Sequence, residues 1–232
     1  MYATALRING TTPRVRNMTM KASGGTIFSI AVGLGGGGPT LSDVTLIATN
    51  GTVTAYGIDA ANASITLNGF TIEASTGSGI AVGINTTVTP VNARDGRITS
   101  TVAGGDAYGI NATFNSTLTV EDVIIRVAGG NCRGVVHRGA SSSLTDVSIG
   151  TALCPGSNFG VYNDETFIPS TVKIESSIIA AATPLSTRSM YETYVGHSKL
   201  DGGPNVLIDG GTVTCAGVWD ETPTFTAGPA CP

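Results

Sequence analysis

Hydrophobic and polar residues alternate along most of this chain in short runs, and these runs return at a fixed interval. The clearest marker is a glycine that follows a larger residue and precedes Ile or Val, at Gly57, Gly83, Gly109, Gly134 and Gly160. These glycines are 26, 26, 25 and 26 positions apart. Looser copies of the phrase occur as Phe28-Ser29-Ile30 before the series and as Arg188-Ser189-Met190 after it. A period this constant predicts a repeat architecture.

Each repeat is expected to contain three short strands. Period-two alternation predicts one strand around the Gly-Ile phrase, a second around sequences such as LTV or ITL, and a third around sequences such as FTIEA or VIIRV. The glycine of the phrase is expected at a corner or bend. A unit of about 26 residues cannot bury its own apolar face, whereas stacked units can, as a coil whose neighbouring turns pair in parallel. The sequence therefore predicts an all-β, single-domain parallel β-helix of about seven coils.

The period sets the expected boundaries along the chain. The coils occupy residues 26–184, after an N-terminal lead-in or partial first coil over 1–25 and before a C-terminal coil and cap over 185–232. The first residues lack the charged start and apolar core of a signal peptide, so we expect the chain to be part of a longer exported protein or a mature fragment.

Stacked coils should align equivalent apolar residues in rows inside the rod. One expected row is Ile30, Ile58, Ile84, Ile110, Val135, Val161 and Met190. A second is Val44, Phe70, Val123 and Val147, and a third is Leu46, Ile72, Ile98, Ile125 and Ile149. Rows of branched side chains pack densely against one another, and they should form the core.

This repeat resembles that of right-handed parallel β-helix proteins, the architecture of pectate lyases, phage tailspikes and many bacterial surface proteins. The resemblance covers about residues 17–184. The closing stretch DGGTVTCAGVWDE is similar to the ends of bacterial exported β-helix proteins. The resemblance implies a right-handed coil, a bacterial or phage origin, and a homo-oligomer formed as a trimer or end to end.

Composition and charge limit the classes of molecule that the chain is expected to bind. A net charge of −4 and a pI near 5.0 argue against nucleic-acid binding, which normally uses a basic surface. No run of 18 apolar residues occurs, so membrane insertion is not expected. The histidines and cysteines lack zinc-site spacing, and neither a metal nor a cofactor is predicted.

The four cysteines fall into two groups. Cys132 and Cys154 belong to one repeat, whereas Cys215 and Cys231 lie near the C-terminus. We expect one disulfide within each group, with free buried thiols as the alternative. Disulfides would indicate an oxidising, extracellular or cell-surface location.

Two sets of polar residues recur at fixed phase. Asp59, Asn85 and Asn111 each follow the repeated Ile and should stack on the outer face or at a corner. Hydrogen bonding along the stack is the plainer interpretation, and a polar row for sugar hydroxyls or Ca²⁺ is the functional one. A second set, expected in turns with ion binding as the alternative, consists of Asp43, Asp95, Asp122 and Asp146.

Aromatic and basic residues give two further candidate sets. Tyr56 and Tyr108 occupy equivalent positions, where plain alternation favours interior packing and a carbohydrate-stacking strip is the alternative. Arg97 and Arg126 belong to a loose group with Arg94, Arg133 and Arg138. A solvated surface is the plainer interpretation of this group, and capture of an anionic glycan is the functional one.

These observations favour a non-enzymatic surface protein that acts as an adhesin, a fibre or a glycan-binding segment. The motifs typical of polygalacturonases (Asn-Thr-Asp, Asp-Asp, Gly-His-Gly and Arg-Ile-Lys) are missing, and we predict no catalytic residue. A polysaccharide lyase or glycoside hydrolase, acting on an acidic polysaccharide, is one alternative. An ice-binding or self-assembling rod is the other, because Thr45, Thr71 and Thr99 recur in phase.

Overall fold

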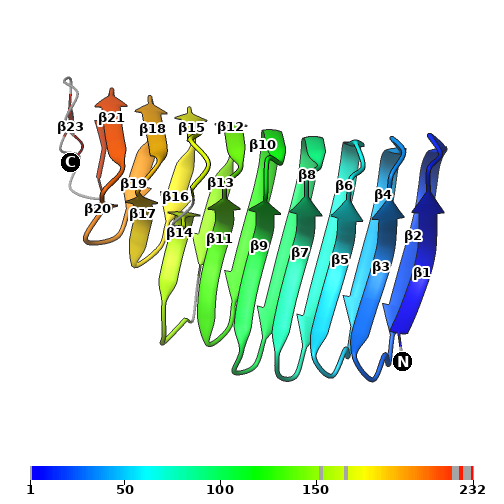
Figure 1. Ribbon diagram of the computed structural model, residues 1–232. Coiled ribbons are helices and arrows are strands. Elements are labelled where there is room, and N and C mark those ends of the chain that lie inside the picture. The colour runs from blue at the N-terminus through cyan, green and yellow to red at the C-terminus, as the bar shows by residue number, and fades with distance from the viewer. Residues whose placement is uncertain (1, 152–153, 165–166, 221–224, 227–230, 232) are drawn as a thin grey trace.

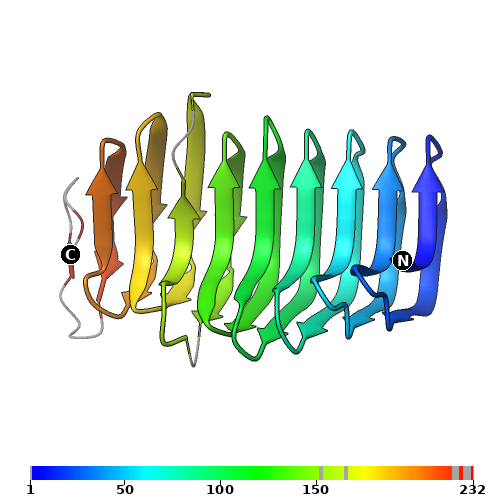
Figure 2. The same ribbon diagram turned by 60° about the horizontal axis from the view of Figure 1, so that its bottom comes forward.

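The computed structural model describes residues 2–151, 154–164, 167–220, 225–226 and 231. Within them the chain is all-β and forms a parallel β-solenoid of about seven turns, with roughly 26 residues per turn, as predicted (Figure 1). Coils at both ends extend the stack, so that one sheet has nine strands and the other has 14. The coils follow one another along the stack in chain order, from the first coil at one end to the last at the other (Figure 2).

Each coil contributes one strand to a first sheet, sheet A, in which all neighbouring strands are parallel. In stacking order its strands are β1 (Tyr2–Asn9), β3 (Phe28–Gly35), β5 (Thr54–Ala61), β7 (Ile80–Thr87), β9 (Asp106–Thr113), β11 (Asn131–Arg138), β14 (Asn158–Asn163), β17 (Thr183–Arg188) and β20 (Val206–Asp209).

The rest of each coil forms sheet B, first as one long strand and later as two short ones. The long strands are β2 (Arg14–Ser23), β4 (Thr40–Thr49), β6 (Ile65–Thr76), β8 (Pro90–Val102) and β10 (Thr117–Ala128). The short ones are β12 (Ser141–Thr145), β13 (Ser148–Thr151), β15 (Ser170–Glu175), β16 (Ile178–Ala180), β18 (Tyr191–Gly196), β19 (Lys199–Asp201), β21 (Thr212–Ala216), β22 (Val218–Trp219) and β23 (Phe225–Thr226). The second and third predicted strands are therefore continuous in the first five coils.

A single left-handed residue bends sheet B in every coil. The bend residues, all with positive φ, are Asn17, Asp43, Gly69, Asp95, Asp122, Asp146, Ser176, His197 and Gly217. Asn, Asp and Gly tolerate this conformation because a short polar side chain, or none, avoids the clash with the backbone. The four predicted turn acids thus all occupy the same bend.

The core lies between sheet A and sheet B, and two of the three predicted rows are confirmed. The row through Leu46, Ile72 and Ile98 pairs in register and is fully buried. The first row needs correction at both ends. Val32, not Ile30, pairs with Ile58, and Leu185, not Met190, follows Val161. Ile30 pairs with Tyr56 instead, and Met190 is 46% exposed.

The repeated glycines lie within the sheet A strands, which corrects the expectation that they mark a corner or bend. Gly57 and Ile58 are both buried, so the alternation of inward and outward residues breaks between them. A Cβ atom on Gly57 would overlap Cγ2 of Ile72 across the core. Glycine is therefore required because the opposite sheet fills the space of its side chain.

Both predicted disulfides are present. Cys132 is bonded to Cys154 and Cys215 to Cys231, across 22 and 16 residues. Residues 1–25 supply β1 and β2, which pair in register with β3 and β4. The expected C-terminal coil and cap, over 185–232, contains most of β17 and all of β18 to β23, and its residues 221–224, 227–230 and 232 lie outside the described residues. In the described part of the chain, no helix is long and apolar enough to cross a bilayer.

Candidate functional site

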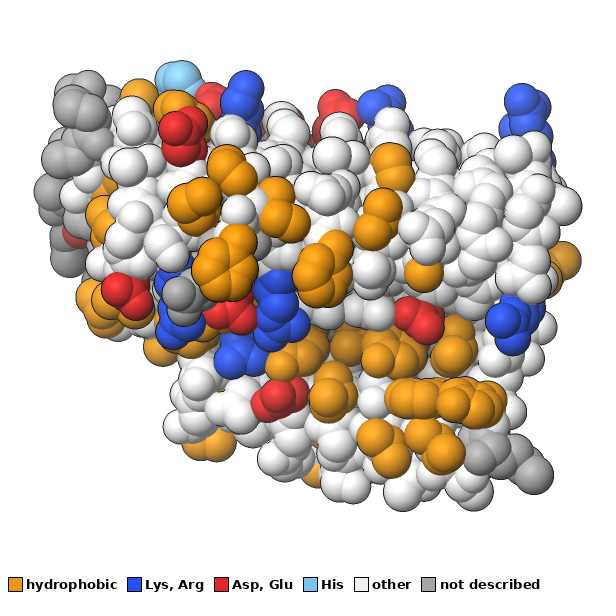
Figure 3. Space-filling model, viewed as in Figure 1, with side chains coloured by type: hydrophobic (Ala, Val, Ile, Leu, Met, Phe, Trp, Pro, Cys, Tyr) orange, Lys and Arg blue, Asp and Glu red, His pale blue; other side chains and the backbone are white. Residues whose placement is uncertain are grey.

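The outer face of sheet A gathers five of the seven residues predicted to bind a ligand. Tyr56 and Tyr108 lie in one outward row, separated by Val82 of the intervening coil. Asp59, Asn85 and Asn111 form the next outward row. In Figure 3, hydrophobic side chains gather on this face beside basic and acidic ones. Arg97 and Arg126 lie elsewhere, exposed on the outer face of sheet B.

Asp59, Asn85 and Asn111 form a hydrogen-bonded ladder along the stack. The Nδ2 atom of Asn85 donates to Oδ1 of Asp59 at 2.8 Å, and Nδ2 of Asn111 donates to Oδ1 of Asn85 at 2.8 Å. The next basic residue continues the chain, because Nη1 of Arg138 donates to Oδ1 of Asn111 at 3.2 Å. The ladder uses one N–H of each amide and one carboxylate oxygen. The remaining amide hydrogens and the second carboxylate oxygen of Asp59 take no part in the ladder, and they could form hydrogen bonds with a ligand.

The aromatic row packs on the outside of the solenoid, so the expectation of interior packing was wrong. Tyr108 belongs to a hydrophobic cluster separate from the main core, and Tyr56 packs against that cluster. The break in alternation at the repeated glycine explains why Tyr56 points outward. Gly57 and Ile58 both face the core, so the residues of the strand that precede the glycine point to the face opposite the one that plain alternation predicts. Burial within the cluster raises the pKa of both phenols above the usual value for tyrosine.

Arginine side chains cover the tyrosine rings farther along this face. The guanidinium of Arg133 lies 5.4 Å from the ring centre of Tyr108 and 5.1 Å from that of Tyr162. Arg188, one coil beyond Tyr162, lies 5.4 Å from the same ring. The contacts are cation–π interactions, and they occupy ring faces that a sugar would otherwise need for stacking. Tyr108 also accepts a hydrogen bond from Nη1 of Arg133 and donates one to Asp106, both at 2.9 Å.

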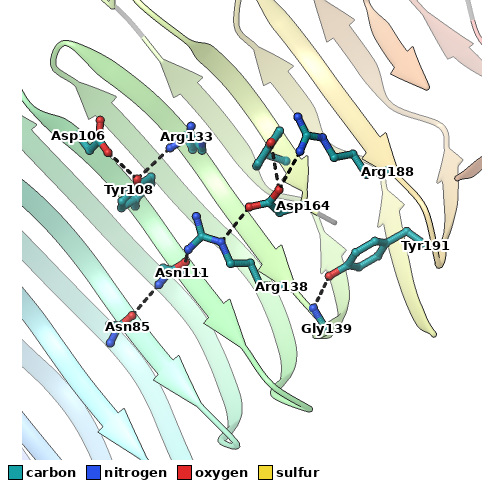
Figure 4. Close-up of polar contacts among 11 residues, drawn as sticks. Asn85, Asp106, Tyr108, Asn111, Arg133, Arg138, Gly139, Asp164, Arg188 and Tyr191 are labelled. Carbon is teal, nitrogen blue, oxygen red and sulfur yellow. Dashed lines mark hydrogen bonds and ion pairs between the residues drawn. The ribbon is translucent and has the colours of Figure 1, made fainter. Parts of the chain in front are cut away.

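Arg138, Asp164 and Arg188 form an outward row of alternating charge at the ends of the sheet A strands, where the chain turns toward sheet B. Asp164 accepts from Nε of Arg138 at 3.0 Å and from Nη1 of Arg188 at 3.3 Å (Figure 4). The Tyr162 hydroxyl donates to the same carboxylate at 3.2 Å. Together with the ladder, these contacts form a continuous polar chain from Asp59 to Arg188. Sequence reasoning placed Tyr162 near the aromatic row of Tyr56 and Tyr108, but it missed Asp164 and Arg188.

The arginines of sheet B make local contacts. Arg126 donates to the backbone and hydroxyl oxygens of Ser148 in the next coil, at 3.2 to 3.3 Å. Arg94 pairs with Glu121 at 3.1 Å. The threonine row expected for an ice-binding surface is interrupted. Thr45 pairs with Thr71, but the next position is Arg97, and Thr99 pairs with Glu73 instead.

A second polar group lies inside the solenoid, behind sheet A. His137 is fully buried, and its Nδ1 atom lies 2.8 Å from Oδ1 of Asn163. The amide of Asn163 donates to the hydroxyls of Thr187 and Thr193 at 3.2 and 2.9 Å. Burial lowers the pKa of His137 from 6.5 to about 4, so the imidazole is neutral at pH 7. Among the described residues, no three His, Cys, Asp or Glu side chains lie close enough to hold a metal ion.

Comparisons with known proteins give no relative from which a function could be transferred. No family model, no curated protein and no solved structure matches this chain. The likeness to parallel β-helix proteins is therefore one of architecture, and no homologue places the chain in the pectate-lyase-like superfamily or assigns it to a bacterium or phage.

Proposed function

We propose that this chain is a non-enzymatic extracellular β-solenoid that binds a glycan on the outer face of sheet A. One observation carries the proposal: hydrogen-bonding side chains are held in register along an outer face that also bears a hydrophobic cluster. Such a face combines the apolar contact and the polar groups that sugars require. The two disulfides support an oxidising location, which is typical of secreted proteins.

The ladder is suited to a repeating ligand. Its amide and carboxylate groups recur once per coil, at the spacing of about 4.8 Å between parallel strands. Each group is already oriented by its neighbour, so a bound sugar chain would lose little free energy in ordering the protein. Sugar hydroxyls both donate and accept hydrogen bonds, and they therefore match a row that presents N–H groups beside a carboxylate.

The acids on this face support binding in preference to catalysis. Asp164 is engaged by two arginines and a tyrosine, while Asp106 accepts from Tyr108 and from the amide of Asn131. A general acid must lie within hydrogen-bond reach of the atom that it protonates. The carboxylate oxygens of Asp106 and Asp164 are already engaged by neighbouring side chains, which favours a structural role for both acids.

A panel of polysaccharides tests the proposal, with retained protein and newly released sugar ends measured in the same samples. Replacement of both Asn85 and Asn111 by alanine removes the centre of the ladder and should weaken binding about tenfold. The matched control replaces Thr71 and Thr99 by alanine on the outer face of sheet B and should leave binding unchanged.

The possible outcomes separate the functions. Retention without released ends, weakened by the ladder variant alone, supports glycan binding by sheet A. Release of reducing or unsaturated ends would overturn the non-enzymatic proposal. An equal loss of polysaccharide binding in the two double variants would show that the binding site is not the ladder of sheet A.

A further inference from the structure

A notch interrupts the outer face of sheet A over its first three strands. It has a volume of about 470 Å³, within the usual range for small-ligand sites. The notch is lined by nine residues, including Tyr2, Arg7, Ile30, Gly33, Gly35 and Asp59. Figure 3 shows a basic and an acidic group on either side of this part of the face, above a band of hydrophobic side chains.

Two glycines of β3 create the notch. Gly33 lies directly between Arg7 of the preceding coil and Asp59 of the following one in the same outward row. Gly35 occupies the next outward position, between Asn9 and Ala61. Glycine within a strand weakens the strand and marks places where a ligand can approach closely. The absent side chains leave a gap in the row where the neighbouring coils carry charged or polar groups.

The gap separates two opposite charges, Arg7 and Asp59, which form no ion pair with each other in the structure. Arg7 and Asp59 are two coils apart, so their backbones are separated by about 10 Å at the parallel-strand spacing. Among the described residues that line the notch, they are the only ones with a charged side chain. Asp59 also ends the hydrogen-bonded ladder, because Asn85 donates to one of its oxygens. The notch is therefore continuous with the proposed glycan-binding row.

Apart from Thr4, the side chains of the remaining walls are mainly apolar. Ile30 and Leu34 line the notch together with Tyr2 and Ala61. The ring of Tyr2 stacks on that of Phe28, with centroids 5.2 Å apart, and the Phe28 ring lies 5.9 Å from that of Tyr56. The ring of Tyr2 is therefore packed against a neighbouring ring and gives one side of the notch an apolar border.

We propose that this notch binds a zwitterionic group, with the anion at Arg7 and the cation at Asp59. A ligand that carries both charges satisfies both side chains, whereas a purely acidic ligand is repelled by Asp59 and a purely basic one by Arg7. In a glycan the group is a sugar residue with a free amine beside an acidic residue, and this form of the inference rests on the proposed function. A free amino acid carries the same chemistry without that function.

Three matched oligosaccharides test the charge requirement by calorimetry. A de-N-acetylated hyaluronan oligomer carries amines and carboxylates, a hyaluronan oligomer carries carboxylates alone, and a chitosan oligomer carries amines alone. The zwitterionic oligomer should bind about tenfold tighter than either other oligomer at low salt, and the difference should shrink as salt is added. Arg7→Gln should abolish its advantage over chitosan, and Asp59→Asn, which keeps an oxygen for Asn85, should abolish its advantage over hyaluronan.

Two further variants separate ligand binding from folding. Gly33→Val fills the notch and should abolish the preference while preserving the fold, because a Cβ atom there lies 3.8 Å from the nearest side chains. Arg97→Gln removes an equally exposed arginine from sheet B and should change nothing.

Each outcome decides between the two proposals. Equal binding of the three oligomers, unaffected by Gly33→Val, overturns the notch and leaves glycan binding by the ladder intact. Failure of all three and of the polysaccharide panel overturns the glycan function. If 6-aminohexanoate alone binds, and Gly33→Val abolishes its binding, the notch takes a free zwitterion and the glycan form of the inference is overturned.

Discussion

The side chain of Ile125 occupies the space in which a side chain on Gly109 would begin. A Cβ atom on Gly109 would overlap Cγ2 of Ile125 and the carbonyl oxygen of Gly134 in the next coil. The same relationship joins Gly57 to Ile72, and it recurs in three other coils. The repeated glycine and the repeated isoleucine of sheet B are thus two halves of one packing contact.

Gly109→Ala should destabilise the fold by about 1–3 kcal/mol, because the core has no room for the added methyl group. The midpoint of urea unfolding measures the change. Gly104→Ala is the matched control, since a Cβ atom on Gly104 meets nothing within 4 Å and the expected change is below about 0.5 kcal/mol. Similar losses in the two variants would contradict the proposed role of the repeated glycine.

His137 should make the folded state sensitive to mild acid. Its pKa is lowered from 6.5 to about 4 by burial, so the unfolded chain takes up a proton at higher pH than the folded one. Its contribution to stability is complete above pH 6.5 and is lost as the pH falls toward 4, by roughly 3 kcal/mol in total.

The free energy of unfolding, measured from pH 7.5 to pH 4, checks this expectation. His137→Asn places an amide near Asn163 and removes the titrating group, so the variant should lose much less stability over that range. Parallel pH profiles for the two proteins would show that His137 does not control the acid response.

Val88 should be a site of stabilising substitution. Its φ of 51° is unfavourable for a β-branched residue, and the equivalent corner residue one coil earlier is Asn62, with φ of 52°. Val88 is 44% exposed, so its side chain contributes little packing. Val88→Asn should raise stability by about 1 kcal/mol through relief of backbone strain.

The melting temperature measures this gain. Val53→Asn is the control, because Val53 is equally exposed at 47% but lacks a positive φ, and it should be neutral or slightly destabilising. A gain of equal size at both positions would show that the cause is replacement of an exposed apolar side chain by a polar one, and not relief of backbone strain.

The disulfide between Cys132 and Cys154 should contribute about 3 kcal/mol, because it closes a loop of 22 residues in the unfolded chain. A variant with alanine at both positions should melt at a lower temperature than the oxidised protein. Reductant should lower the melting temperature of the parent more than that of the variant, which retains the Cys215–Cys231 bond. Free thiols in the unreduced, denatured protein would contradict the pairing.

The sequence by itself determined the period, the strand class and two of the three inner rows, and it favoured the two disulfide pairs that the structure contains. Stacked coils place equivalent residues next to one another, so a local pattern such as Leu46, Ile72 and Ile98 directly predicts a three-dimensional contact. The ladder of Asp59, Asn85 and Asn111 was predictable for the same reason.

Only the tertiary structure decided which way the residues before the repeated glycine point. Plain alternation places Tyr56 inside, but Ile72 of the opposite sheet requires a glycine at position 57 and reverses the phase there. Ile30 and Thr99 were assigned to the wrong rows because each was placed two positions out of register. The true partner of Ile58 is Val32, and that of Thr71 is Arg97. The contacts of Asp164 with Arg138 and Arg188, and the notch at Gly33, join residues of neighbouring coils whose identities do not repeat. A periodic pattern carries no information about such contacts, because they depend on how the differing side chains of three coils meet in space.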